Sequence, residues 1–319
     1  MIKLNITNKL ASIIVIGIVS FAICLGIYFD SYLKDSYYKE AKNKLENGFS
    51  RLILEVQKIE SNLKSGISFV QNDEAFIASI DLVNSYQDKN NYNEILLDEE
   101  KKLIASKLLD KVKLSLNDDI TLYDKNEELI ASVRKKNGEY ILNFLSFENG
   151  KTLIYSKNEN EDEYTKQEFT PNLQKEFKHI RATLLEKNNS ELTAITYFFF
   201  IFTIYIESHL YIKNTNSKNI LAHIEMAKRL DKPFFDSLPR DINVSVGINK
   251  TFEENFQTNI LSDINLLKNL KIEETSEHYY SQTLINTTNK IAVGIKLFLD
   301  KKILLNALNE IRTQIFLMI

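Results

Sequence analysis

Two histidines and two glutamates lie in neighbouring stretches of alternating polar and apolar residues, and their side chains are typical metal ligands. In residues 204–212, every second position starting at Ile204 is mostly isoleucine or leucine, and residues 220–226 alternate in the same way from Ile220. The polar residues at the intervening positions, the polar parity, are Tyr205, Glu207, His209, Tyr211, His223 and Glu225. Imidazole nitrogens and carboxylate oxygens suit zinc and other divalent transition metals. This parity is therefore the candidate site for a ligand or a metal, with His209 and His223 as the metal ligands.

The two stretches are predicted to pair as a β-hairpin whose turn is centred on Asn216. This register places Tyr211 opposite Leu221, His209 opposite His223, and Glu207 opposite Glu225. Directly opposed residues point to the same face of a sheet, so the imidazoles and carboxylates are expected to converge between Tyr205 and Tyr211. A slip of one residue would send His223 to the other face.

The sequence leaves three interpretations of this face open. It binds a small ligand or a divalent metal such as zinc. Without a metal, the two close histidines respond to pH near about 6 to 7. Alternatively, the face is simply solvated or covered by a helix, with its glutamates paired to nearby lysines.

No set of residues typical of an enzyme accompanies this face, and we expect a protein that is not an enzyme. The chain has four histidines but no H-E-x-x-H, G-x-S-x-G or P-loop motif. Asp118 and Asp119 precede a predicted strand and are interpreted as a turn or cap. The basic residues 134–136 are interpreted as a solvated loop rather than an anion site.

Charge and cysteine content exclude two further classes. The net charge is −3 with both signs spread along the chain, which argues against a nucleic-acid partner. Cys24 is the sole cysteine, so an internal disulfide is excluded.

An uncharged stretch near the N-terminus predicts a membrane anchor. Residues 10–29 carry no charge and, at about 1.5 Å per residue, are long enough to cross a bilayer core of about 30 Å. Lysines precede this stretch and Asp30 follows it, so residues 1–9 are predicted to be a cytoplasmic tail. Residues 30–312 are then extracytoplasmic, on a chain that crosses the bacterial inner membrane once. A cleaved signal peptide is the alternative, but its apolar region would be shorter.

The C-terminal residues 313–319 are also apolar. They are interpreted as the start of a second membrane helix. The alternative is a last amphipathic helix that packs on the domain.

A long stalk helix is predicted over residues 31–70. Its apolar residues recur at steps of four and three, as in the seam of a coiled coil. The seam residues are Leu52, Val56, Ile59 and Leu63. We expect this helix to associate in parallel with a second copy, giving a homodimer, although an ordinary stripe facing the core of one chain has the same spacing.

The remainder of the chain predicts an α+β fold with antiparallel sheet. Residues 120–157 alternate as a strand meander, and the apolar stretch 192–206 is interpreted as one or two buried strands rather than a membrane span. A final hairpin over residues 278–299 leads into an exit helix near Asp300.

This order of elements resembles the extracytoplasmic Cache or CHASE4-type sensor regions of bacterial receptors, which have PAS-like antiparallel sheets flanked by helices. Three phrases carry the resemblance: "ITLYDKNEELIAS" (120–132), "ILAHIEMAKRLDKPFFDSL" (220–238) and "LINTTNKIAVGIKLFLDKKIL" (284–304). The chain departs from the family pattern where glycines are usual, with Glu127 or Glu128 in the first phrase and Ala222 and His223 in the second.

The resemblance covers residues 31–314 and implies a sensor region over residues 30–312, in which residues 71–312 form one or two PAS-like modules. Such regions bind a small molecule outside the cytoplasm and signal to a histidine kinase, a cyclic-di-nucleotide enzyme or a chemotaxis module. No GGDEF, EAL or H-box run occurs in the chain, and no amine- or carboxylate-binding signature narrows the ligand. The alternative is a membrane-anchored scaffold that uses the same sheets to bind another protein.

Overall fold

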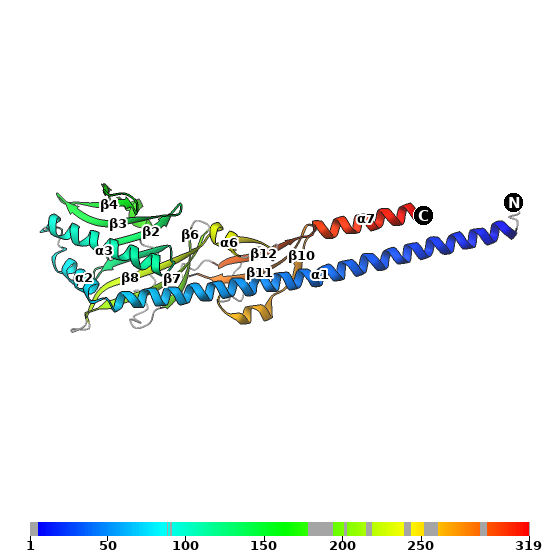
Figure 1. The fold of residues 1–319 in the computed structure, drawn as a ribbon, viewed down its shortest axis with the longest axis horizontal. Helices are drawn as coiled ribbons and strands as arrows, with labels where there is room; N and C mark the ends of the chain where they lie inside the picture. The colour runs from blue at the N-terminus through cyan, green and yellow to red at the C-terminus, as the bar shows by residue number, and fades with distance from the viewer. Residues whose placement is uncertain are drawn as a thin grey trace.

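The computed structural model describes residues 6–87, 89, 91–177, 194–200, 203–214, 219–238, 244–251, 261–287 and 292–318. These residues have the predicted α+β fold. The molecule is elongated, and helix α1 (Ile6–Gln71) runs along almost its whole length (Figure 1). Two β-sheets lie side by side along α1, and the C-terminal helix α7 (Lys302–Met318) continues beyond them beside α1.

The remaining elements follow the chain between these two helices. The other helices are α2 (Glu74–Tyr86), α3 (Glu94–Leu114), α4 (Pro171–Glu176), α6 (Lys232–Ser237) and the 3-10 helix η2 (Ile264–Asn269). The larger sheet is built from β1 (Asp119–Asp124), β2 (Leu129–Lys136), β3 (Glu139–Glu148), β4 (Lys151–Asn158), β5 (Thr165–Glu168), β6 (Ala194–Phe200), β7 (Thr203–Lys213) and β8 (Ile220–Leu230). The smaller sheet is built from β9 (Ser245–Thr251), β10 (Glu273–Glu274), β11 (His278–Asn286) and β12 (Ala292–Asp300).

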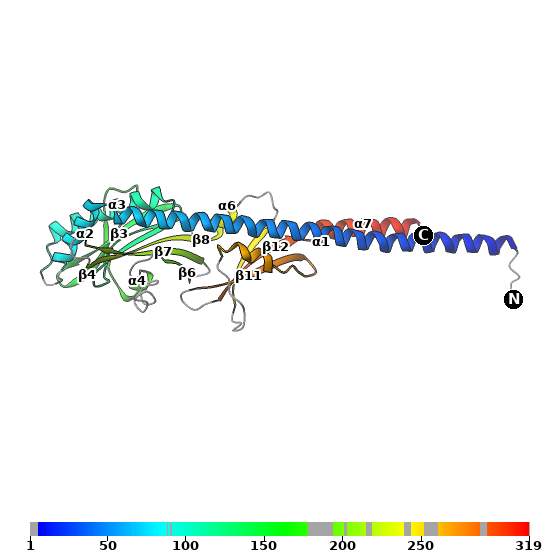
Figure 2. The same ribbon diagram turned by 90° about the horizontal axis from the view of Figure 1, so that it is seen from below.

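Both sheets are antiparallel throughout. The eight-stranded sheet has the order β5-β4-β3-β2-β1-β8-β7-β6, so two meanders meet where β1 pairs with β8. The four-stranded sheet has the order β10-β11-β12-β9, and its strand β12 leads directly into α7. Figure 2 shows α1, α2 and α3 on one side of the larger sheet and the short helix α4 on the other.

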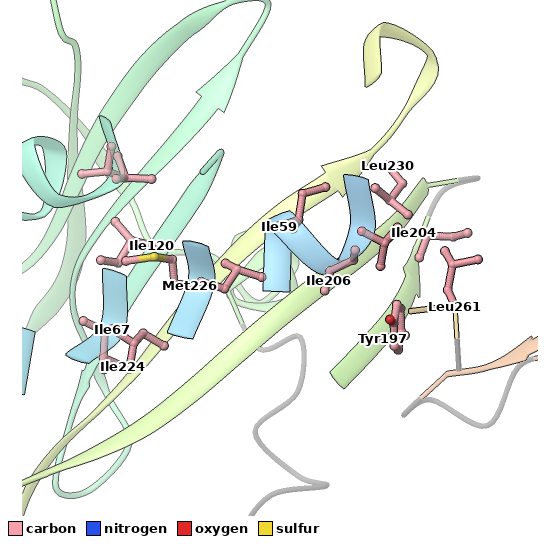
Figure 3. Packing of buried hydrophobic residues seen from close by; sticks show 14 of the residues in the cluster. Ile59, Ile67, Ile120, Tyr197, Ile204, Ile206, Ile224, Met226, Leu230 and Leu261 are labelled. Atoms are coloured by element: carbon pink, nitrogen blue, oxygen red, sulfur yellow. The ribbon is translucent and has the colours of Figure 1, made fainter. Parts of the chain in front are cut away.

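The hydrophobic core lies between α1 and the larger sheet. Because side chains alternate along a strand, the isoleucine parity of β7 and β8 points at α1. Ile204, Ile206, Ile224 and Met226 from the strands pack in one cluster with Ile59 from α1, and each is at most 7 % exposed (Figure 3). Burying an aliphatic side chain of this size stabilises a fold by about 1.5–3 kcal/mol.

The predicted coiled-coil seam on α1 is used within one chain. Leu52, Val56 and Leu63 are at most 1 % exposed, and Ile59 is 7 % exposed, because all four pack into the hydrophobic core. These side chains are therefore covered by the chain's own sheets. The prediction that they form the seam of a parallel dimer is wrong, and the alternative of a stripe facing the core is the one observed.

The predicted strands and the exit helix agree with the structure apart from their ends, but two loop interpretations are wrong: residues 134–136 lie in strand β2, and Asp119 is the first residue of β1. The side chain of Asp73 caps α2 by accepting a hydrogen bond from the backbone N–H of Phe76. Helix α3 begins at Glu94, where the side chain of Asn93 accepts a hydrogen bond from the backbone N–H of Leu96.

The strand and exit-helix predictions are confirmed where the structure describes them. The apolar stretch 192–206 contributes to the pair of strands β6 and β7, joined through residues that lie outside the described part of the chain. The final hairpin is β11 and β12, and α7 is the exit helix.

Gly66 lets α1 approach the larger sheet closely. A β-carbon built at Gly66 would lie 2.8 Å from the sulfur of Met226 on β8 and 2.9 Å from Cβ of Ser115. Both distances are shorter than van der Waals contact, and Ser115 is held by hydrogen bonds to the end of α3. The position therefore has no room for a larger side chain.

We expect Gly66→Leu to destabilise the chain by about 1–3 kcal/mol, because overpacking forces the surrounding side chains and backbone to shift. The measurement is the unfolding midpoint of the full chain in detergent. Gly17→Leu is the matched control, since a β-carbon at Gly17 meets nothing within 4 Å. Equal effects of the two substitutions would contradict the close approach at Gly66.

Candidate functional site

The polar parity of β7 and β8 lies on the face of the larger sheet that points away from α1, and it is buried. Glu207 and His209 are each 3 % exposed, His223 is 2 % exposed and Glu225 is 7 % exposed. The interpretation of this parity as a solvated face is therefore wrong. Buried charged and polar groups are rare unless they interact with one another or with a ligand.

The register of the hairpin differs from the prediction by two residues. Tyr211 pairs with His223, His209 with Glu225, and Glu207 with Ala227. A β-bulge near the end of the hairpin, at Leu221, contributes to this shift, because Ile212 pairs with Ala222 while Lys213 pairs with Ile220. The turn residues 215–218 lie outside the described part of the chain. A shift of two residues keeps every side chain on its face.

The two histidines stack beside each other on this face. The ring centroids of His209 and His223 are 5.7 Å apart with an interplanar angle of 24°. The Tyr211 ring lies 4.9 Å from the His223 ring, and the Tyr123 ring of β1 lies 5.8 Å from it. Three strands therefore bring aromatic rings together in one stack.

Glu225 lies between the two imidazoles. Its Oε1 atom is 3.9 Å from Nδ1 of His209 and 3.8 Å from Nδ1 of His223. On the other side of His209, Oε2 of Glu207 lies 3.9 Å from Nε2. One nitrogen from each histidine and one oxygen of Glu225 all lie within 4.8 Å of one another.

Burial controls the protonation of this cluster. Loss of water, and secondarily the nearby His223, lowers the pKa of His209 to about 3, so its imidazole is neutral at physiological pH. The expected response of His209 to pH near 6 to 7 is therefore wrong. Burial also raises the pKa of Glu207 well above its usual range, and the neighbouring carboxyl groups of Glu225 and Asp119 add to this shift.

The predicted tyrosines lie at opposite ends of the site. Tyr211 belongs to the ring stack beside His223. Tyr205 pairs instead with Arg229 of β8, near Asp119, and burial raises its pKa. The structure thus brings His209, Tyr211, His223 and Glu225 together, with Glu207 beside them and Tyr205 farther along β7.

Three residues of β1 and β2 also belong to this face and were not predicted from the sequence. Tyr123 stacks on His223, as described above, and Thr121 pairs with Glu225 across the β1–β8 junction. Arg134, interpreted as part of a solvated loop, lies in strand β2, with its guanidinium carbon 4.2 Å from the centroid of the Phe177 ring. The alternation of Asp119, Thr121 and Tyr123 was the available signal, but their neighbours on β8 are far away in sequence.

Helix α4 and the residue after it cover the part of this face that β1–β4 form. Tyr123, Leu129, Leu145, Ile154 and Phe177 make a second, smaller hydrophobic cluster there. The Tyr123 hydroxyl donates a hydrogen bond to the backbone carbonyl of Phe177. A cleft of about 250 Å³ lies beside this cluster, lined by Tyr123, Phe147, Phe169 and Phe177 among others. Its volume is slightly below the roughly 300–1,000 Å³ of pockets for drug-sized molecules, which suits a smaller ligand.

The comparisons with known proteins give remote structural likenesses. No protein-family model matches the chain, and no curated protein matches it. The extracellular domain of the histidine kinase vpHK1S-Z8 is similar at 9 % identity and a TM-score of 0.43, over 83 % of this chain and 94 % of that one. A sensory box/GGDEF family protein from Vibrio parahaemolyticus gives 8 % identity and a TM-score of 0.43, over 82 % and 98 % of the two chains.

The sensory domain of the Campylobacter jejuni chemoreceptor Tlp3 gives 10 % identity and a TM-score of 0.39, over 84 % of this chain and 96 % of that one. A structure of that domain with isoleucine bound is also similar, with a TM-score of 0.37. The first of these structures is described as an extracellular domain and the chemoreceptor structures as sensory domains.

We expect Tyr123→Phe to lower the free energy of unfolding by about 1–3 kcal/mol, because the buried Phe177 carbonyl loses its hydrogen bond from the tyrosine. Urea unfolding of the full chain in detergent measures this loss. Tyr211→Phe, which removes a hydroxyl beside the same histidine, should change the value by less than about 0.5 kcal/mol. Similar values for the two variants would contradict a stabilising Tyr123–Phe177 bond.

Proposed function

We propose that the chain is a membrane-anchored sensor that binds a small ligand at the buried polar face of the larger sheet and signals through α1 and α7 to a cytoplasmic output module. The observation that carries the proposal is that strand β8 contributes side chains to both faces of the larger sheet. His223 and Glu225 face the site, while Ile224 and Met226 face α1. A ligand that moves β8 therefore acts directly on the helix that leads to the membrane.

The apolar segment of α1 supports the membrane anchor. Residues 10–29 form part of a helix that is long and apolar enough to cross a membrane. Large apolar side chains are exposed around this segment; Leu10, Ile13, Ile16, Phe21 and Ile27 are each more than 60 % exposed. Contact with lipid would remove this surface from water. We place the segment in the inner membrane, with residues 1–9 in the cytoplasm and residues 30–312 outside it.

The pairing of α7 with α1 supports transmission across that membrane. A β-carbon at Gly26 would lie 2.5 Å from Cδ1 of Ile315, so the helices approach closely at this glycine. Nη2 of Arg312 lies 2.9 Å from Oδ1 of Asp30, at the edge of the apolar segment. This contact supports residues 313–319 as the start of a second membrane helix. A shift of packed helices by about 1–2 Å is a known form of signal.

The two sheets support a division of the sensor region into two PAS-like modules. The eight-stranded sheet with α2–α4 forms the module far from the membrane segment, and the four-stranded sheet forms the near one (Figure 1). The candidate ligand site belongs to the far module. α1 packs on strands of both sheets and joins the two modules.

We expect a reporter that is active only in the cytoplasm to be inactive when it is fused after Asn160, in the turn that follows β4. The reason is the excess of lysine before the apolar segment, which keeps the N-terminus inside. Cell-based reporter activity is the measurement. The same reporter fused at the N-terminus is the control and should be active. Activity of the Asn160 fusion would place the sheets in the cytoplasm and refute the proposal.

Ligand binding is tested with the purified full chain in lipid nanodiscs and a library of small metabolites. At least one compound class is expected to raise the melting temperature, by about 5 °C at a concentration 100-fold above its Kd. Glu225→Gln, which neutralises the carboxylate between the histidines, should reduce this rise. Ser208→Ala is the matched control, because Ser208 lies on the opposite parity of β7 and is fully buried.

Two results would count against the sensor. If neither the compounds nor simple metal ions shift the wild-type melting temperature, the scaffold alternative gains support. If a compound acts equally on wild type and Glu225→Gln, it binds elsewhere.

A further inference from the structure

We infer that the cluster on β7 and β8 is a site for a divalent transition-metal ion, with a ring nitrogen of His209, a ring nitrogen of His223 and a carboxylate oxygen of Glu225 as its ligands. This inference rests on the proposed function and names the chemical class of the ligand. Zinc is the ion that the ligand set fits best.

The spacing of the three groups is close to that of a metal site. A tetrahedral zinc ion with bonds of about 2.0–2.1 Å holds its ligand atoms roughly 3.4 Å apart. The two distances from Glu225 to the histidines are 3.9 and 3.8 Å, so each needs to shorten by only about 0.5 Å. The set as a whole lies within 4.8 Å. Closing the set around one ion therefore requires the pair farthest apart to shorten by up to about 1.4 Å, through rotation of the side chains and movement of the strands that carry them.

The donor atoms favour a transition metal over magnesium or calcium. Calcium takes about 6–8 oxygen ligands, and magnesium keeps several waters and binds carboxylates. Two imidazoles and one carboxylate suit zinc, copper, nickel or iron instead. Three protein ligands leave a coordination position for water or another small group.

Glu207 is placed to orient His209. Metal-binding histidines usually donate their second ring N–H to a carboxylate or carbonyl, which fixes the ring and its tautomer. Oε2 of Glu207 lies 3.9 Å from Nε2 of His209, while Nδ1 of the same ring faces Glu225. We assign Glu207 as a positioning residue: when this distance shortens to about 3 Å, its carboxylate accepts a hydrogen bond from Nε2–H and leaves Nδ1 for the ion.

A cation would also offset an electrostatic cost of this face. Two carboxyl groups, Glu207 and Glu225, are buried within the same cluster, and the charge of Glu225 disfavours ionisation of Glu207. A doubly charged ion among them favours the ionised forms. The neutral imidazole of His209 is already in the state that binds a metal.

The effect of ion binding would be passed to α1 by the residue that follows Glu225 on β8. Glu225 is followed by Met226, whose sulfur lies against Gly66 of α1. Pulling Glu225 toward the histidines moves the β8 backbone that carries Met226. The metal site is thereby connected to the helix that continues into the membrane segment.

The test uses the untagged full chain in nanodiscs, stripped of metal with a chelator. Titration calorimetry with Zn²⁺ should give one ion per chain, and saturating Zn²⁺ should raise the melting temperature by about 5 °C. Co²⁺ should give the intense visible absorption of a four-coordinate site. These wild-type measurements require no variant, so they decide the inference even if a variant fails to fold.

Variants then assign the ligands. His209→Ala combined with His223→Ala should abolish the zinc-dependent rise in melting temperature. Glu207→Gln should weaken Zn²⁺ binding by about 10–100-fold without changing the stoichiometry, as expected of an orienting residue. His278→Ala removes a histidine of β11 in the smaller sheet and should leave binding unchanged.

The outcomes separate this inference from the proposed function. No Zn²⁺ or Co²⁺ binding by wild type, or unchanged binding by the double histidine variant, overturns the metal site. If an organic compound nevertheless binds and depends on Glu225, the sensor proposal stands without the metal. If Zn²⁺ binds as expected but the Asn160 fusion is active in the cytoplasm, the metal site stands and the extracytoplasmic sensor fails.

Discussion

The structure depends on strand β8 meeting two opposite requirements on alternate residues. Ile224 and Met226 must enter the core against α1, while His223 and Glu225 must lie on the other face. Because side chains alternate with a period of two, a slip of one residue would place charged groups in the core and move Ile224 and Met226 to the polar face. β8 also pairs with β1 on one edge and β7 on the other, so it fixes how the two meanders join. The alternation of side chains along β8 therefore determines both where the core lies and where the candidate site lies.

Burial of ionisable groups on the far face of the sheet carries a free-energy cost. This cost raises the pKa of Glu207 and lowers the pKa of His209, so that both side chains favour their neutral forms. Farther along the face, Asp119 also has a raised pKa, which the charges of Arg229 and Arg134 oppose. Fold stability alone would favour apolar residues at such positions. Retention of two carboxyl groups and two imidazoles is the pattern expected where a protein gives up stability for a binding site.

The sequence was sufficient to predict local structure and insufficient to predict long-range partners. Alternation identified β7 and β8 and the shared face of His209 and His223. The register was wrong by two residues, and the bulge at Leu221, which nothing in the sequence marks, accounts for one of them. The apolar stripe on α1 was predicted from the sequence, but it was expected to pack on a second copy of the helix. It packs on the chain's own sheets, because apolar residues at this spacing can face a sheet as well as a second helix. The burial of the polar face and the contributions of Tyr123 and Arg134 depend on β1, β2 and α4, which no local pattern connects to β7 and β8.

Helix α1 is a single unbroken helix of 66 residues and contains none of the chain's three prolines. At a rise of about 1.5 Å per residue it is about 100 Å long. Sharp bends in helices occur at proline, at Gly/Ser pairs, at π-bulges or at inserted groups. The pair Ser65-Gly66 lies in the part of α1 that packs on the larger sheet, and the helix runs through it unbroken. Axial rotation or sliding of α1 at the larger sheet would therefore be carried to the opposite end of the helix with little loss. A distant binding event would then change the rotation of α1 about its own axis relative to α7, rather than bend either helix.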